Sequence, residues 1–240
     1  MCKKSKSCTL LGDESRAWSK TVPLPPPDWF DGQLLLFCDA AEKAANGERD
    51  KAIQILKTTK SDDMREWFDE HGQASGGHRY RRWPVYAPKG EELDPIKSLT
   101  ARIANGVFNR DSYTCRYCGL RVIAKEVLEA FKRAVDAPQD RDVAASHFFT
   151  STGKGSTNAL QHGVVHAFKI VADHVIPHRC GGRTDLANLV TSCPGCNYGK
   201  AHYTIEQLGL DDPRDRPPAK SEWNGLTSLV DGLKSHELRA

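Results

Sequence analysis

The sequence predicts a protein in which a small α-helical domain precedes a second domain organised by zinc. Apolar residues with helical spacing in residues 28–75 and two Cys-x-x-Cys pairs farther along the chain carry this prediction. A chain of 240 residues can bury one good core and a second small one. We expect a flexible lead at 1–27, the helical domain at 28–75, a linker and lead-in helix at 76–106, the zinc domain at 107–210 with an insert at 120–165, and a polar tail at 211–240.

Three short helices are expected in residues 28–75. Asp28 is the expected N-cap of the first helix, and Gly47 interrupts the apolar pattern before the second. Ser61 is placed to begin the third helix, in which apolar side chains recur at helical spacing at Met64, Trp67 and Phe68. These residues are typical of a core, and nothing in the three helices indicates catalysis.

Composition and charge limit the classes of protein to consider. The net charge of +3 is too small by itself to indicate a polyanionic partner. The longest apolar run, residues 34–38, is far shorter than a membrane span, and no hydrophobic signal core follows the N-terminus. We therefore expect a cytoplasmic protein without a membrane span. In that compartment, eight cysteines indicate metal binding or burial rather than disulfides.

Four of the cysteines have the spacing of a zinc site. Cys115 and Cys118 form one Cys-x-x-Cys pair, and Cys193 and Cys196 form the other. Two such pairs supply the four thiolates of a closed tetrahedral site, which leaves no open position to activate water. The expected cofactor is thus a structural Zn²⁺, and chance pairing or a redox role is the alternative.

A basic and aromatic segment lies in the expected linker. Arg79, Arg81 and Arg82 alternate there with Tyr80 and Trp83. Cations interleaved with aromatic rings suit contacts to phosphates together with stacking on bases, so this pattern favours nucleic-acid binding. The alternative is a solvated linker whose aromatic side chains pack on a neighbouring domain.

Four motifs in sequence order, "CRYCG", "DHVIP", "GGRTDLANLV" and "CPGCNYGKA", resemble the zinc-containing HNH endonucleases over about residues 108–210. The resemblance implies the α+β fold class, with a ββα-metal fold of two strands, a loop and a helix. Asp173 and His174 would lie on the first strand, and Asn197 would lie at the start of the helix after the last cysteine. On this view, the zinc holds Asn197 opposite Asp173.

The resemblance also implies roles for individual residues. His174 would be the general base, while Asp173 and Asn197 would bind a catalytic Mg²⁺ or Mn²⁺. Asn188 would order the loop between the strands and help to orient the histidine. Lys200 would contact a phosphate of the nucleic acid. The competing interpretations are a buried, hydrogen-bonded histidine for His174 and a plain surface lysine for Lys200.

The implied activity is metal-dependent cleavage of DNA, with a role in restriction or anti-phage defence. The helical domain would then dock on a protein partner such as an ATPase. The alternative is a non-catalytic zinc-ribbon module that binds nucleic acid or protein, but such a module does not require Asp173, His174 and Asn197 at this spacing. His162 and His166, which lie between the first cysteine pair and Asp173, are weaker candidates for the cleft, since histidines on a short helix are commonly surface or core residues.

Overall fold

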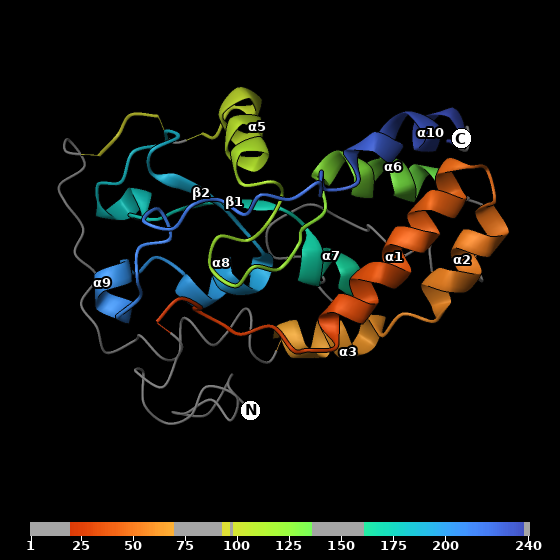
Figure 1. The fold of residues 1–240 in the computed structure, drawn as a ribbon, viewed down its shortest axis with the longest axis horizontal. Coiled ribbons are helices and arrows are strands. Elements are labelled where there is room, and N and C mark those ends of the chain that lie inside the picture. The colour runs from red at the N-terminus through yellow and green to blue at the C-terminus, as the bar shows by residue number, and fades with distance from the viewer. Residues whose placement is uncertain (1–19, 70–92, 97, 136–160, 238–240) are drawn as a thin grey trace. The chain divides into compact units, whose positions relative to one another are not determined.

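The described residues of the chain, 20–69, 93–96, 98–135 and 161–237 of a computed structural model, fall into two compact units (Figure 1). The strand unit takes its described residues from Met1–Pro26, Phe68–Val122 and Ile170–Trp223. The helical unit takes its described residues from Pro27–Trp67, Ile123–Lys169 and Asn224–Ala240. Each unit is therefore assembled from separate stretches of the chain.

The helical unit is built from short helices. In chain order they are α1 (Phe30–Ala45), α2 (Arg49–Lys57), α3 (Ser61–Trp67), α6 (Lys125–Val135), α7 (Gly163–Phe168) and α10 (Val230–Ser235), with a 3-10 turn, η6 (Thr227–Leu229), before α10. The expected cap of α1 is wrong. Trp29 rather than Asp28 is the N-cap residue, and no side chain caps the helix. The Phe30 N–H instead bonds the Pro27 carbonyl at 3.0 Å, so the turn before the helix satisfies this donor.

Aromatic side chains join distant stretches of the chain in the core of the helical unit. Phe37 of α1 contacts Phe131 of α6 with 5.0 Å between ring centroids, and Phe30 contacts Phe168 of α7 at 5.6 Å. All four rings are buried. Helices α6 and α7 belong to this unit because their apolar faces pack on α1. The units therefore do not follow the domain boundaries expected from the sequence, where α6 lay in an insert of the zinc domain.

The strand unit contains a ββα arrangement, and the expected α+β fold class is confirmed. β1 (Val171–His174) pairs antiparallel with β2 (Leu189–Ser192), with Asp173 opposite Val190. α8 (Pro194–Lys200) follows β2 and packs against β1, while α5 (Ala101–Arg110) packs against β2. The unit also contains a 3-10 turn between the strands, η5 (His178–Cys180), and the short helix α9 (Ile205–Leu208).

The last residues of the expected flexible lead belong to the strand unit. Leu24 is fully buried, and its carbonyl oxygen lies 3.7 Å from Cys196 Sγ. Gly199 of α8 permits this approach, because a Cβ at that position would lie only 2.8 Å from Leu24 Cβ. Leu24 therefore packs on α8, although the sequence predicted a flexible lead here.

A buried carboxylate fixes α5 to the strand and to the first cysteine pair. Asp111 is 0% exposed and accepts hydrogen bonds from Arg110 Nε at 2.8 Å, Arg116 Nη1 at 3.0 Å and the Thr191 N–H at 2.8 Å. Burial alone would raise the pKa of Asp111, but these donors hold it below its usual range. The ionised carboxylate is thus a structural centre of the unit.

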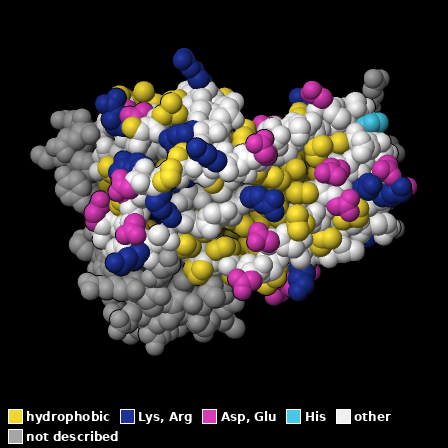
Figure 2. All heavy atoms as spheres, viewed as in Figure 1, with side chains coloured by type: hydrophobic (Ala, Val, Ile, Leu, Met, Phe, Trp, Pro, Cys, Tyr) yellow, Lys and Arg dark blue, Asp and Glu magenta, His cyan; other side chains and the backbone are white. Residues whose placement is uncertain are grey.

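Charged side chains of both signs are interspersed on the face shown in Figure 2. Among the described residues on this face, Lys and Arg alternate with Asp and Glu rather than gathering in one basic patch. In the described part of the chain, no helix combines the length and the apolar character needed to span a bilayer.

Candidate active site and zinc site

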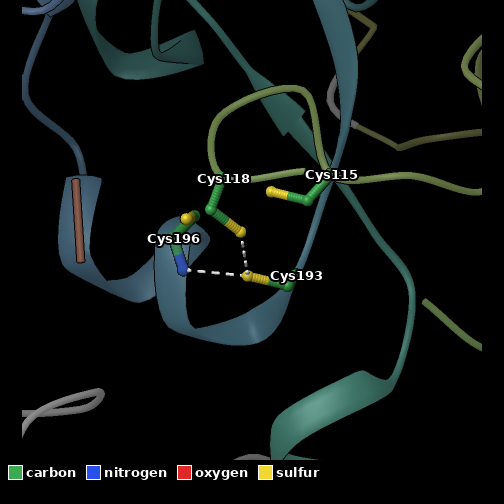
Figure 3. Close-up of side chains that lie close together, drawn as sticks. All are labelled: Cys115, Cys118, Cys193 and Cys196. Atoms are coloured by element: carbon green, nitrogen blue, oxygen red, sulfur yellow. Dashed lines mark hydrogen bonds between the residues drawn. The ribbon is translucent and has the colours of Figure 1, made fainter. Parts of the chain in front are cut away.

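Four cysteines of the strand unit converge on one point (Figure 3). The sulfur atoms of Cys115, Cys118, Cys193 and Cys196 all lie within 4.8 Å of one another, and those of Cys118 and Cys193 are 3.7 Å apart. A tetrahedral zinc with Zn–S bonds of about 2.3 Å places its sulfurs about 3.8 Å apart. The cluster therefore fits a structural zinc ion, as its spacing in the sequence predicted.

Local backbone geometry forms both cysteine pairs. After the first pair the chain turns at Gly119, whose φ of 79° suits glycine and whose N–H bonds the Cys115 carbonyl at 2.9 Å. In the second pair Cys193 is the N-cap of α8, and its sulfur lies 3.4 Å from the Cys196 N–H. The Arg116 N–H also bonds the Thr191 carbonyl at 2.8 Å, which attaches the first pair to β2.

The chemistry of the thiols supports a structural role for the metal. Burial raises the pKa of the Cys196 thiol well above its usual range, so the positive charge of a metal ion is needed to displace its proton. Four thiolates would complete the tetrahedral shell of a zinc ion and leave no position for water. Zinc bound by these cysteines would stabilise the strand unit, and the reactive groups would lie elsewhere.

Asp173 of β1 is connected to the zinc site through Tyr117. Asp173 is 5% exposed, and its Oδ2 accepts a hydrogen bond of 2.6 Å from the hydroxyl of Tyr117, which lies between Cys115 and Cys118 in the sequence. Burial raises the pKa of Asp173, and the charge of Lys200 and the Tyr117 hydrogen bond oppose that rise. One residue thus connects a zinc knuckle to the candidate catalytic carboxylate.

Lys200 is placed inside the strand unit. It is 0% exposed, and its ammonium nitrogen lies 3.3 Å from Asp173 Oδ2 as an ion pair without hydrogen-bond geometry. This position differs from the phosphate contact expected from the sequence. The reason is that α8 packs its last turn against β1, so the side chain points to Asp173 rather than to solvent.

His174 follows Asp173 at the end of β1. Its Nε2 lies 3.0 Å from the Thr184 hydroxyl, and the ring is half-buried. Burial lowers the pKa of His174 below its usual value, with the charge of Asp173 opposing the shift. The imidazole is therefore neutral at pH 7, which is the state that a general base requires.

Asn188 organises the loop between the strands. Its Oδ1 accepts from the Ile176 N–H at 2.9 Å, and its Nδ2 donates to the carbonyls of Ile176 and Arg183, both at 2.9 Å. Gly182 lies beneath this amide, since a Cβ there would approach the Ile176 carbonyl oxygen to 1.8 Å. The loop that follows His174 is held closed by one side chain.

The remaining predicted residues occupy other places. Asn197 is half-buried one turn into α8 rather than at its start, because the helix begins at Pro194. His162 caps α7 in the helical unit, with its Nδ1 3.3 Å from the Val164 N–H, and burial lowers its pKa to about 3. His166, on α7, is also buried. The basic residues Arg79, Arg81 and Arg82 lie outside the described residues.

A comparison with known families identifies the region that contains this site. Residues 163–202 match the sequence model of the family described as HNH endonuclease. This segment is an HNH endonuclease domain. The match includes both strands, the loop held by Asn188, and α8 with the second cysteine pair of the zinc site. The comparisons with curated proteins and with solved structures found no match.

Two residues of the HNH site were missed in the sequence. Tyr117 is visible in "CRYC" only as a residue between two zinc ligands, and Thr184 only as part of the loop motif. Their contacts to Asp173 and His174 span 56 and 10 residues of sequence, respectively. Spacing alone does not reveal such contacts, because they depend on how the knuckle and the loop fold back on β1.

Proposed function

We propose that this HNH protein is a divalent-metal-dependent endonuclease that hydrolyses phosphodiester bonds of DNA, with His174 as its general base. The observation that carries the proposal is the pair of side chains at the end of β1. There a neutral imidazole adjoins a buried carboxylate whose orientation is fixed by Tyr117 and Lys200. A domain that only binds zinc and nucleic acid does not require a histidine base next to a buried carboxylate.

Asp173 and Asn197 are the residues that would hold the catalytic Mg²⁺ or Mn²⁺. Among the described residues, Tyr117 and Lys200 both contact Oδ2 of the Asp173 carboxylate, which leaves Oδ1 as an oxygen ligand. Carboxylate and amide oxygens are the ligands that these hard cations prefer. The bound ion would stabilise the negative charge that develops on the phosphate and on the departing oxygen.

The protein side chains divide the remaining work. His174 accepts a proton from the attacking water, and the oxygen of that water forms a bond to phosphorus while the bond to the departing oxygen breaks. Lys200 keeps a positive charge next to Asp173, and Asn188 keeps the loop closed around His174. Departure of the 3′ oxygen would leave a 5′-phosphate on the product.

Contacts to the DNA backbone are assigned to the linker. Arg79, Arg81 and Arg82 stay the predicted phosphate ligands, because cations alternating with aromatic rings suit a polyanion. Lys200 is reassigned from phosphate binding to the support of Asp173, since its amine is buried. A charge-to-neutral change in the linker arginines should weaken DNA binding and reduce its dependence on salt.

A role in restriction or anti-phage defence also stays a prediction, together with a protein partner such as an ATPase. Residues 28–75 are the segment proposed to dock on that partner. Co-purification of the full chain and of a chain lacking this segment with the product of a neighbouring gene tests the idea. Unchanged binding and cutting after the deletion would contradict it.

Cleavage of supercoiled plasmid tests the proposed function. Wild type, His174→Ala and the control His236→Ala, which changes a histidine of the helical unit, are compared in Mg²⁺ or Mn²⁺ at matched zinc content. We expect His174→Ala to lose at least about 100-fold in nicking rate and the control to cut like wild type. Equal cutting by all three proteins, or DNA binding without any cutting, would overturn the proposal.

A further inference from the structure

A chain of hydrogen bonds leads away from the ring of His174. Its Nε2 lies 3.0 Å from the Thr184 hydroxyl oxygen, and that hydroxyl donates to the main-chain carbonyl of Ile96 at 2.7 Å. A hydroxyl has one proton and a carbonyl only accepts, so the proton of Thr184 is committed to Ile96. Toward His174 the hydroxyl offers only lone pairs. His174 Nε2 must therefore carry a proton, which it donates to Thr184.

This arrangement fixes the state of the other ring nitrogen. A neutral imidazole has a single N–H, so a proton on Nε2 leaves Nδ1 with a free lone pair. Thr184 is 2% exposed, so water does not compete for its hydroxyl. The hydrogen bond also persists after Nδ1 gains a proton, because both nitrogens of the imidazolium are donors. Proton transfer to Nδ1 thus requires no rearrangement around Thr184.

Asp94 holds the far end of the chain of hydrogen bonds. Its Oδ2 accepts from the Thr184 N–H at 2.8 Å, and its Oδ1 accepts from the Ile96 N–H at 2.9 Å. These two N–H groups hold the pKa of Asp94 below its usual range, so the carboxylate stays ionised near neutral pH. The Asp94 carbonyl also bonds His178 Nε2 at 2.9 Å. Residues 94 to 96 are thereby attached to the loop between the strands.

We infer that Asp94 and Thr184 are positioning residues that hold His174 in the Nε2–H tautomer, so that Nδ1 takes the proton from the attacking water. This inference rests on the proposed function. Asp94 lies outside residues 163–202, the segment that matches the HNH family. Residues 94 to 96, which precede α5 and are distant in sequence from the matched segment, therefore contribute to the active site by holding Thr184. The proton on Nδ1 is released to solvent after the phosphodiester bond has been cut.

Nitrogen NMR of the histidine ring tests the tautomer directly. The full-length, zinc-loaded chain is labelled with ¹⁵N, and the ring of His174 is assigned by its absence from the spectrum of His174→Ala. Above the pKa of the ring, wild type should show a protonated Nε2 and an unprotonated Nδ1. Thr184→Val, which keeps the shape but removes the hydroxyl, should lose this pattern and show a mixture of tautomers, whereas Thr184→Ser should restore it.

Kinetics provide the second readout. We expect Thr184→Val to lower the single-turnover nicking rate about 100-fold, the effect of a misplaced reactive group, with unchanged zinc content and unchanged half-saturating Mn²⁺ concentration. Thr184→Ser should recover most of the rate. Thr58→Val, an exposed threonine whose hydroxyl also bonds a main-chain carbonyl, is the matched control and should behave as wild type.

The outcomes separate this inference from the proposed function. A wild-type ring protonated on Nδ1, or an unchanged spectrum and rate in Thr184→Val, would overturn the inference. If Thr184→Val does not fold, Asp94→Asn provides the same test. It replaces the carboxylate with a neutral amide and so weakens the hydrogen bonds that Asp94 accepts from the Thr184 and Ile96 N–H groups. A third outcome is that wild type shows the expected tautomer but His174→Ala still cuts DNA. The tautomer assignment would then stand, while the catalytic role of His174 and the proposed function would both be overturned.

Discussion

Replacement of Tyr117 by phenylalanine removes one hydroxyl from the contact between the zinc knuckle and Asp173. The side chain is buried, and its hydroxyl donates to Asp173 Oδ2 at 2.6 Å. Burial and the charge of Asp173 raise the pKa of Tyr117 well above its usual range, so the phenol stays protonated and donates at every pH of interest. Tyr117→Phe therefore removes a permanent hydrogen bond and very little volume.

The expected loss follows from the kind of hydrogen bond. A bond to a charged partner contributes about 1.5–3 kcal/mol, and each 1.4 kcal/mol is about tenfold in an equilibrium constant. If this bond serves to orient the carboxylate for the catalytic ion, Tyr117→Phe should weaken Mn²⁺ binding about 10- to 100-fold. The zinc content should remain at the wild-type level, because the four cysteine ligands are unchanged.

Titration calorimetry with Mn²⁺ on zinc-loaded protein measures this effect without relying on activity. Tyr198→Phe is the control, since Tyr198 is exposed and contacts Phe68 in the same unit. Wild type and control should bind alike, and Tyr117→Phe should bind more weakly and nick plasmid only at higher Mn²⁺. Binding of Mn²⁺ within twofold of wild type by Tyr117→Phe would refute a role for Tyr117 in orienting Asp173.

Three further changes test other parts of the structure. Burial lowers the pKa of His162 from 6.5 to about 3, so the unfolded chain binds a proton there between these pH values that the folded chain does not. The free energy of unfolding should therefore decrease as the pH is lowered. In urea unfolding, wild type should lose about 2 kcal/mol more of it than His162→Asn between pH 7 and pH 5, and an equal loss in the two proteins would contradict this. Asp111→Asn should cost about 3–5 kcal/mol in the same assay, because it leaves the buried Arg116 without a counter-charge and removes the ion pair to the exposed Arg110. Replacement of the exposed Asp231 by Asn should cost little. Gly182→Ala would place a Cβ 1.8 Å from a main-chain carbonyl, so nicking and melting temperature should both drop, and a result like that of the unobstructed control Gly32→Ala would show that the loop is not tightly closed.

The zinc site could be predicted from the sequence because its information is local. Each Cys-x-x-Cys pair occupies a few residues, and the turn at Gly119 follows from the same stretch. The order of strand, loop, strand and helix was predictable for the same reason, since the motifs that mark them lie within residues 163–202. Fold class and zinc ligands therefore required no knowledge of distant contacts.

Long-range packing could not be predicted in this way. Nothing in the sequence of α6 indicated that Phe131 would contact Phe37 of α1. Likewise the burial of Lys200 depends on how α8 lies against β1. The local sequence is the same whether the lysine faces solvent or Asp173, so it does not predict burial. Partners that are distant in sequence, such as Ile96 and Thr184, become neighbours only in the folded chain.

The proposed function divides the work between two metal sites: zinc at the four cysteines would hold the fold, and a separate divalent ion at Asp173 would serve the chemistry. The most direct test is the nicking rate of the full chain, loaded with one zinc per molecule, as Mg²⁺ or Mn²⁺ is added to metal-free buffer. We expect no cutting before the addition and saturable cutting after it, with the zinc content constant throughout. Full cutting by the zinc-loaded protein without added Mg²⁺ or Mn²⁺ would contradict the separation of the two metal sites.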